Sequence, residues 1–258
     1  MTRVALRQRS RPWASRNPPA RQGRAGTIVM KMKGSFRRVR DYSGIIMNRQ
    51  LVRFAFVATL LLALPLGAAE LVPISLPAPE RTGGRPLMQV LQERKSIREI
   101  GTNAIPLQSL ANLLWAGFGT NRVEDHRTAP STMNARVIDI YVALPEGVYV
   151  YEAQGHRLRP VVAGDLRSKT GGQDFVKTAP VALIFVADLP RLEKAKPEDR
   201  ERYANIDAGF ISQNIYLYCA SAGLATVVHE LDRRELPALL KLKPGQRIII
   251  AQSVGFPK

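Results

Sequence analysis

Cysteine and histidine are scarce in this chain, which holds one cysteine, Cys219, and three histidines in 258 residues. A single cysteine excludes a disulfide within the chain, although exported proteins without disulfides are common. The sequence contains no CxxC, HExxH or His-rich segment, so no spacing typical of a metal site is present. Cys219 lies in the apolar string YLYCASAGL, where we expect a buried, inert thiol rather than a nucleophile.

Acidic residues are also few, and the N-terminal part of the chain has almost none. The chain has 38 Lys and Arg against 21 Asp and Glu, a net charge of +17. Residues 1–46 hold 12 of these cations and one acid, and 47–69 add two arginines, which leaves +4 for 70–258. Because the globular part is nearly neutral, we expect no nucleic-acid partner. We interpret 1–46 as a disordered extension from a start codon assigned too early.

Residues 47–69 have the order of a secretory signal peptide. A methionine and two arginines precede an apolar run over 54–66, and Gly67-Ala68-Ala69 follows. This is the pattern of a basic region, a hydrophobic region and a cleavage site. The run of about 13 residues is shorter than the roughly 20 that a transmembrane helix needs. We expect export to the periplasm, cleavage before Glu70 and no stable membrane span.

The remaining 189 residues are enough for one domain with its own core. Residues 70–85 are rich in Pro and Gly and predict an extended arm. A helix is expected over 86–95. A second begins at Pro106, with leucines spaced as on a buried helical stripe, and is expected to end at Gly117 and Gly119.

Strand patterns dominate the next part of the chain. Residues 137–142, 147–153 and 158–163 are rich in β-branched and aromatic side chains and are separated by turns, which predicts an antiparallel meander. The apolar runs at 181–187 and 247–255 predict buried strands. Helices are expected over 165–178, 197–222 and 233–242, and the second half of the longest is apolar nearly all round, which predicts full burial. The class is α+β, with an antiparallel or mixed sheet flanked by helices.

Two polar segments carry possible binding chemistry. The string RKSIR at 94–98 offers cations and a hydroxyl that suit a phosphate, and it also fits a solvated basic helix end. The string RTAPSTMN at 127–134 can hydrogen-bond a ring edge or a phosphate, and it also fits a turn with capping residues. Taken alone, each segment favours the simpler structural interpretation.

Taken in order, longer strings resemble the nitroreductase-like flavoproteins, in the branch of the azoline-oxidising dehydrogenases of thiazole/oxazole peptide synthesis. The resemblance spans about 86–257. The strings are ERKSIREI (93–100), LANLLWAGFGTNR (110–122), RTAPSTMNARVIDIYVA (127–143), GVYVYE (147–152), GDLR (164–167), DFVKTAPVALIFVAD (174–188), DAGFISQNIYLYCASAGLATVV (207–228) and QSVGFPK (252–258).

This resemblance implies an FMN-binding domain over 86–258 and a homodimer with FMN at its interface. The cofactor-binding residues that it implies are Arg94, Lys95, Ser96, Arg98, Pro130, Ser131, Asn134, Thr226 and Val227. The first four would hold the phosphate, the next three would approach the flavin from the partner subunit, and the last two would lie along the ring. It further implies ping-pong electron transfer through the flavin N5 to or from a small organic substrate, with NAD(P)H as a possible reductant. The alternative is a module that binds or senses FMN without turnover.

The chain also departs from relatives in this family. The string ATVVH stands where many of them have a Gly or an acid near N5, and the chain stops at Lys258, where many continue to a basic pair. Either Lys258 replaces that pair, or the phosphate site relies on the segment at 94–98 alone. No motif matches the Lys-Tyr pair of azoline oxidation, so that activity is disfavoured.

Other polar side chains have a structural interpretation as well as a functional one. The arginines at 122, 127 and 136 are candidates for stabilising a reduced flavin or are structural. His126 is expected to face solvent, His156 to lie in a turn, and Asp165 and Arg167 to form an ion pair or cap. His229 is a weaker candidate for contact with the ring or the substrate.

Overall fold

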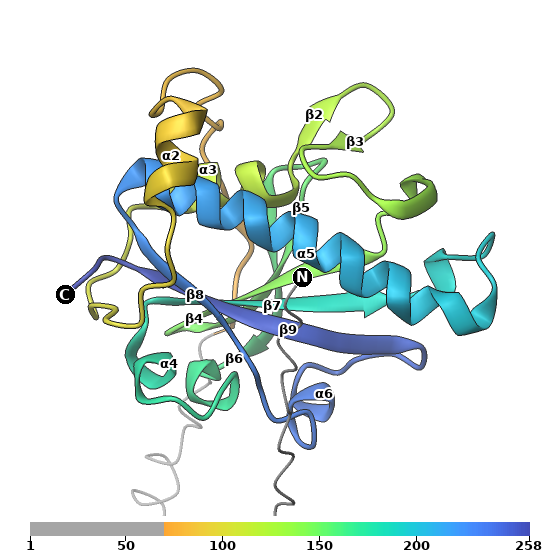
Figure 1. The fold of residues 1–258 in the computed structure, drawn as a ribbon. Helices are drawn as coiled ribbons and strands as arrows, with labels where there is room; N and C mark the ends of the chain where they lie inside the picture. Colours follow the sequence, from red (N-terminus) through yellow and green to blue (C-terminus); the bar gives the residue numbers. More distant parts are fainter. Residues whose placement is uncertain (1–69) are drawn as a thin grey trace, which may run out of the picture. The chain divides into compact units, whose positions relative to one another are not determined.

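The computed structural model describes residues 70–258, so the extension and the signal peptide expected over 1–69 lie outside the described residues. In the described part, seven strands form one sheet in the order β1-β6-β5-β4-β7-β9-β8, and β2 and β3 form a separate hairpin (Figure 1). Their bounds are Ile74–Ser75 (β1), Thr120–Arg122 (β2), His126–Arg127 (β3), Ile138–Leu144 (β4), Gly147–Glu152 (β5), Arg157–Ala163 (β6), Val181–Asp188 (β7), Ala225–His229 (β8) and Gln246–Gly255 (β9).

Helices connect these strands and cover the sheet. They are Leu87–Glu93 (α2), Leu107–Phe118 (α3), Asp174–Thr178 (α4), Pro197–Ala222 (α5) and Leu236–Leu239 (α6), with short 3-10 turns at Thr132–Asn134 (η1), Arg167–Lys169 (η2) and Leu189–Arg191 (η3). All pairs of neighbouring strands in the described residues are antiparallel. The predicted α+β class and meander are confirmed.

The longest helix, α5, begins and ends where its sequence predicts. Pro197 occupies its first turn, where a missing N–H costs nothing, and two acidic residues follow it. Gly223 terminates the helix in the left-handed conformation, with φ at 71°. α5 lies across one face of the sheet with α3 beside it, and α6 lies on the opposite side (Figure 1).

The sheet has a buried layer on each face. On the α5 side, Ile140 and Phe185 pack with Ile211 and Ile215 of the helix. On the other side, Ile184 and Val186 pack with Leu236 and Leu240. Every side chain of β7 from Val181 to Ala187 is buried, because this strand lies between β4 and β9 and is covered on both faces.

Several helix predictions need correction. The helix expected over 165–178 is two short pieces, η2 and α4, because Gly171 and Gly172 interrupt it. The predicted end of the second helix is confirmed, because α3 ends at Phe118 with Gly119 as its C-cap residue. A Cβ at Gly117 would lie 3.0 Å from Cγ1 of Ile215, so this glycine permits the close approach of α3 to α5. The helix expected over 233–242 is reduced to α6.

Burial of α5 also differs from the prediction. Its buried residues follow one face, while Ile206 and Phe210 are 43% and 45% exposed on the other. The strands β1 and β8 and the β2–β3 hairpin were not predicted as strands. Among residues 70–258, no helix is long and apolar enough to span a bilayer.

Candidate functional site

Segment 94–98 continues directly from α2 and runs along the free edge of β8. The N–H of Ile97 donates to the carbonyl of Thr226 at 3.0 Å. Further along, Ile100 bridges to Pro257, and the N–H of Lys258 donates to the carbonyl of Glu99 at 3.0 Å. These backbone bonds bring the C-terminal residue of the chain beside the basic segment.

The cations of segment 94–98 are available to a ligand. Lys95 and Arg98 are exposed, and the guanidinium of Arg94 lies 5.3 Å from the ring centroid of Tyr216. Within residues 70–258, none of the three forms an ion pair with a carboxylate. Ser96 adds a hydroxyl beside them. Unpaired cations next to a hydroxyl fit the phosphate group that the sequence resemblance implies.

Tyr216 of α5 joins this segment to the sheet, and sequence reasoning missed it. Its hydroxyl accepts the N–H of Val228 at 2.9 Å and lies 2.9 Å from Oγ of Ser96. The side chain is 9% exposed. The sequence places this tyrosine on the buried stripe of a long helix. That position indicates a hydrogen-bonding role, because a buried phenol needs a partner.

The strand β8 presents its backbone, not its predicted side chains, to this region. Thr226 and Val227 are 2% and 1% exposed. The hydroxyl of Thr226 donates to the carbonyl of Ser253 at 2.9 Å and accepts from Nε2 of Gln252 at 3.0 Å. A ligand beside β8 would therefore meet the main chain. The N–H of Val228 is donated to the hydroxyl of Tyr216, so it is not free for a ligand.

Loop 130–134 is held against α5 by one buried carboxylate. Asp207 is 1% exposed. It accepts the hydroxyl of Ser131 at 2.9 Å, and both the N–H and the hydroxyl of Thr132 at 3.0 and 2.9 Å. The Ser131 oxygen also accepts the N–H of Arg136 at 2.8 Å. Sequence reasoning missed Asp207, although a lone acid in the apolar part of the helix was a signal.

The backbone of this loop is strained. Met133, Asn134 and Arg136 have φ values of 55°, 51° and 48°, a region that residues other than glycine rarely adopt. Such conformations persist only where neighbouring contacts hold them, as Asp207 does here, and they are frequent at ligand sites. Pro130 and Asn134 are exposed on the loop and remain available for contact.

The two predicted segments do not meet within one chain. Tyr216 and Asp207 are nine residues apart on α5, which corresponds to about 13 Å along the axis and roughly two and a half turns. Segment 94–98 and loop 130–134 therefore lie on opposite flanks of the helix. The exposed side chains of Ile206 and Phe210 lie on the face between these flanks.

The remaining candidate side chains have structural partners. Arg127 and Arg136 pair with Asp125 at 2.8 and 3.4 Å. Asp165 and Arg167 form the predicted ion pair, at 2.7 Å. The exposed Arg122 donates to its neighbour Asn121.

Cys219 and the histidines also have structural surroundings. Cys219 is fully buried, and burial raises the pKa of its thiol, which agrees with an inert residue. His156 lies in the β5–β6 turn, 2.9 Å from the hydroxyl of Tyr151. His229 is buried, and its Nε2 lies 2.9 Å from the hydroxyl of Ser253. His126 is partly exposed, with 38% of its side chain accessible.

Comparisons with known proteins identify the family and the fold. Residues 91–256 match the model of the Nitroreductase family. The crystal structure of a protein from Ralstonia eutropha, provisionally named a nitroreductase, is 46% identical, covers 72% of this chain and 90% of its own, and superposes with a TM-score of 0.69.

Two further relatives extend the likeness. A Methanocaldococcus jannaschii protein, also provisionally named a nitroreductase, is 30% identical over 168 residues, which are 61% of this chain and 85% of that one. A structure from Anabaena variabilis shares the fold at 20% identity and a TM-score of 0.63, over 72% of this chain and 42% of its own.

Proposed function

This chain belongs to the nitroreductase family, and on that premise we propose that it is an FMN-dependent oxidoreductase acting on a small organic substrate by a ping-pong cycle. Membership of the family supports an oxidoreductase. The identity of the cofactor, FMN, is a further part of the proposal. The observation that carries it is the group of unpaired cations at Arg94, Lys95 and Arg98 beside the hydroxyl of Ser96. Lys258 extends this group from the C-terminus.

The residues of the chain bind and orient the cofactor rather than react with it. Segment 94–98 would hold the phosphate, and the ring would lie beside β8 near Thr226 and Val227, as the family resemblance implies. When bound, FMN accepts and donates hydride at N5, with NAD(P)H as the proposed reductant. Tyr216 fixes segment 94–98 and β8 relative to each other, so it would position both parts of the cofactor.

We further propose that the protein is a homodimer that shares each flavin site. Exposed apolar side chains lie on α2 and α5, at Leu87, Met88, Leu91, Ile206 and Phe210. Patches of this kind mark interfaces. Because segment 94–98 and loop 130–134 flank α5 on opposite sides, a partner packed across the α5 face could bring its own Pro130, Ser131 and Asn134 toward the flavin.

A substitution on α5 tests the shared site. Phe210→Asp should produce a monomer with at least tenfold weaker FMN binding, because a charge at an apolar interface opposes association and a ligand that binds only the dimer stabilises it. Val123→Asp is the control, since Val123 is 82% exposed on a different part of the chain. Sedimentation with and without FMN measures both. A monomer that binds flavin with wild-type affinity would refute the shared site.

A spectrum tests the main proposal. The purified protein should show the visible absorption bands of oxidised flavin, and NADPH should bleach them. A second electron acceptor should then restore them. A bound flavin that no reductant bleaches would favour the alternative, a module that binds or senses FMN without turnover. The azoline-oxidising branch remains a proposal from sequence alone, and thiazoline oxidation is not expected.

Export is a separate proposal that rests on residues 47–69 alone. The mature chain would begin at Glu70 and lie in the periplasm, where NAD(P)H is scarce, so another reductant would then be needed. Intact-mass measurement on protein from the native envelope fraction should give a chain of 189 residues. Recovery of the full chain with residues 1–46 attached would contradict this proposal.

A further inference from the structure

A cleft of about 1510 Å³ lies where two neighbouring strands of the sheet separate. The register of β4 with β5 ends at Tyr141↔Val150, although β4 still pairs with β7, and β5 with β6, beyond that point. Residues 138–140 of β4 and 151–153 at the end of β5 all line the cleft. The facing edges of the two strands are therefore exposed to the cleft instead of bonded to each other along their whole length.

The main chain of Ile138 and Ala153 points into this gap. Leu144 and Gly147 close the β4–β5 hairpin on either side of a two-residue turn, which makes them a hydrogen-bonded pair. Such pairs recur at every second residue of an antiparallel ladder, so Ile138 and Ala153 would form one if the strands stayed together. Within residues 70–258, the N–H of Ala153 donates to no backbone carbonyl, although the residue is only 8% exposed. An unpaired donor on a strand edge is a position where another extended chain can pair.

The walls of the cleft carry charged side chains that are paired with one another. On the β6 side, Glu152 accepts from Arg157 at 2.6 Å and from Arg159 at 2.7 Å. On the β4 side, Arg191 donates to both oxygens of Asp139 at 2.8 Å. These groups are held in place, and they retain hydrogen-bonding capacity, because a carboxylate oxygen has a second lone pair and a guanidinium has five N–H groups. They can therefore bind the amide or hydroxyl of a neutral ligand.

The other charged groups of the cleft favour neither sign of ligand charge. Asp125 and Asp188 are paired with arginines. The exposed side chains of Glu193, Lys241 and Lys243 form no ion pair within residues 70–258, and they include both signs. A neutral polar ligand therefore fits this lining better than an ion does.

One buried hydroxyl in the cleft also lacks a partner. Tyr141 is 8% exposed, and its hydroxyl forms no hydrogen bond within the described part of the chain. Tyr141, Val150 and Arg159 are direct neighbours across β4, β5 and β6, so their side chains share one face of the sheet. A buried phenol needs a hydrogen-bond partner, which a polar ligand in the cleft supplies.

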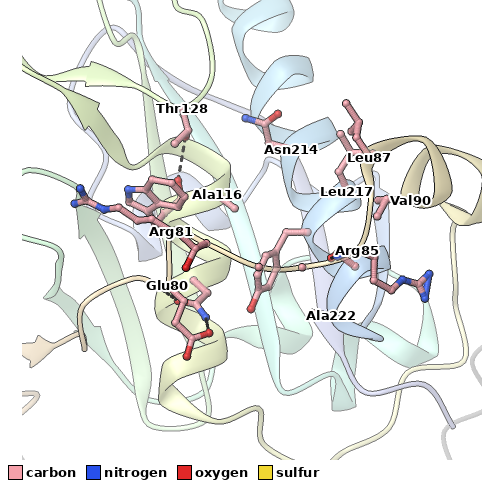
Figure 2. Close-up of a pocket in the computed structure, with 17 residues that line it drawn as sticks. Glu80, Arg81, Arg85, Leu87, Val90, Ala116, Thr128, Asn214, Leu217 and Ala222 are labelled. Atoms are coloured by element: carbon pink, nitrogen blue, oxygen red, sulfur yellow. Dashed lines mark hydrogen bonds between the residues drawn. The ribbon is translucent and has the colours of Figure 1, made fainter.

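We propose that this cleft binds a short, polar, extended peptide. Its main chain pairs with the free strand edge at Ala153, and its side chains hydrogen-bond the paired charges of the walls and the hydroxyl of Tyr141. The cleft includes none of the nine residues assigned to the cofactor and none of the five exposed apolar side chains assigned to the dimer. The groove in Figure 2 differs, because Leu87 of the dimer surface lines it. Peptide binding therefore requires neither flavin nor a change in the dimer.

Amide NMR of the full chain, titrated with a blocked pentapeptide of alternating threonine and glutamine, tests the proposal. The signals of Ile138 and Ala153 should shift as the peptide binds. Two analogues carry N-methyl groups, one on its threonines and the other on its glutamines. Because alternate residues of a strand direct their N–H groups to opposite edges, at least one analogue should bind at least tenfold more weakly. Equal affinity of all three peptides, or no shift at either residue, would overturn the proposal.

A proline variant tests the free N–H itself. Ala153→Pro removes this donor and should weaken binding of the unmodified peptide by at least tenfold. Gln154→Pro is the matched control, because Gln154 is the second residue of the turn that the N–H of His156 closes onto the carbonyl of Ala153, a position that favours proline. Unchanged binding in Ala153→Pro would contradict the proposal. The comparison of the three peptides needs only the wild-type protein, so it stands even if this variant folds poorly.

Two further titrations separate the cleft from other sites and other occupants. Saturation with FMN should leave peptide binding unchanged, and competition by FMN would place the peptide at the cofactor segments and overturn the proposal. Concentration of the protein alone should leave the signals of Ile138 and Ala153 in place. Shifts of these two signals without peptide would show that a second copy of the chain fills the cleft, and would overturn the proposal as well.

Discussion

Segment 94–98 and loop 130–134 both place polar side chains beside α5, but they use those side chains differently. The basic segment leaves three cations without carboxylate partners and is held through its backbone, by Ile97 and its neighbours. The loop does the reverse, since Ser131 and Thr132 direct their hydroxyls inward to Asp207. One segment keeps its charges for a ligand, while the other uses its hydroxyls to maintain a strained shape.

This difference separates affinity from stability. Removal of side chains from the basic segment should reduce binding of an anion and have a small effect on the fold, because Lys95 and Arg98 are exposed and the contacts of Arg94 and Ser96 are with Tyr216. Removal of the anchor of the loop should reduce the stability of the fold first, because a buried carboxylate and its donors lose their partners. The conformation of the loop would follow.

The largest effect is expected in the basic segment. Arg94→Ala with Ser96→Ala removes charge-assisted hydrogen bonds that contribute about 1.5–3 kcal/mol each, so the affinity for FMN should fall by at least tenfold. The midpoint of thermal unfolding of the apoprotein should change little. Flavin fluorescence titration measures the affinity, with Arg122→Ala as the control. Wild-type retention of flavin would show that these residues are structural.

A smaller effect, on stability instead of affinity, is expected in the loop. Asp207→Asn leaves a nitrogen donor facing the donors of Ser131 and Thr132, so unfolding should become easier by about 3 kcal/mol. Denaturant unfolding of the apoprotein measures it. Asp174→Asn is the matched control, because Asp174 is exposed and pairs only with Lys177. If the two variants unfold at the same denaturant concentration, Asp207 does not anchor the loop.

The sequence predicted the fold better than it predicted the hydrogen-bond partners of the polar side chains in these two segments. Pro197 and Gly223 mark the ends of α5, and continuous apolar runs mark the strands β7 and β9, because those signals are local. The role of Ser131 depends on Asp207, 76 residues later, and the role of Ser96 depends on Tyr216, 120 residues later. Hydrogen bonds of that separation leave no local pattern.

Gly117 shows the same limit in the core. Glycine near the end of a helical pattern predicts termination, and α3 ends one residue later at Phe118. The packing of Ile215 of α5 against the bare backbone of Gly117 leaves no such local signal. Exposure of Phe210 was equally hidden, since an apolar residue on a long helix can face its own core or a partner. Strand β8 was missed because its five residues follow a helix directly and show no alternation.

Tyr216→Phe should give a still smaller effect, on both affinity and stability. It removes the hydrogen bond from Val228 and the contact with Ser96 but keeps the ring that Arg94 covers. A net loss of about 1 kcal/mol is expected, so the affinity for FMN should fall roughly fivefold and unfolding should become slightly easier. Tyr218→Phe removes a phenol on the other side of α5 and should leave FMN binding unchanged. Equal effects of the two variants would exclude a positioning role for Tyr216.

The smallest expected effect is a difference between β8 and the loop in how their stability depends on pH. Burial lowers the pKa of His229, the last residue of β8, from its ordinary 6.5. The unfolded chain therefore binds the proton first, and the stability that neutral His229 contributes is present above about pH 6.5 and is lost below it. Burial raises the pKa of Asp125, beside the loop, but hydrogen bonds from Thr120 and Arg127 outweigh this and lower it below 3.8.

The contribution of Asp125 is accordingly present above pH 3.8 and is lost only as the pH falls through more acidic values. Hydrogen exchange at pH 7.5 and 5.5, corrected for intrinsic rates, should show reduced protection over 225–231 and unchanged protection over 123–136. His229→Gln should abolish the change, because glutamine does not titrate. If both segments lose protection together, or if the loss persists in His229→Gln, acid weakens the whole domain and the two flanks of α5 are not independent.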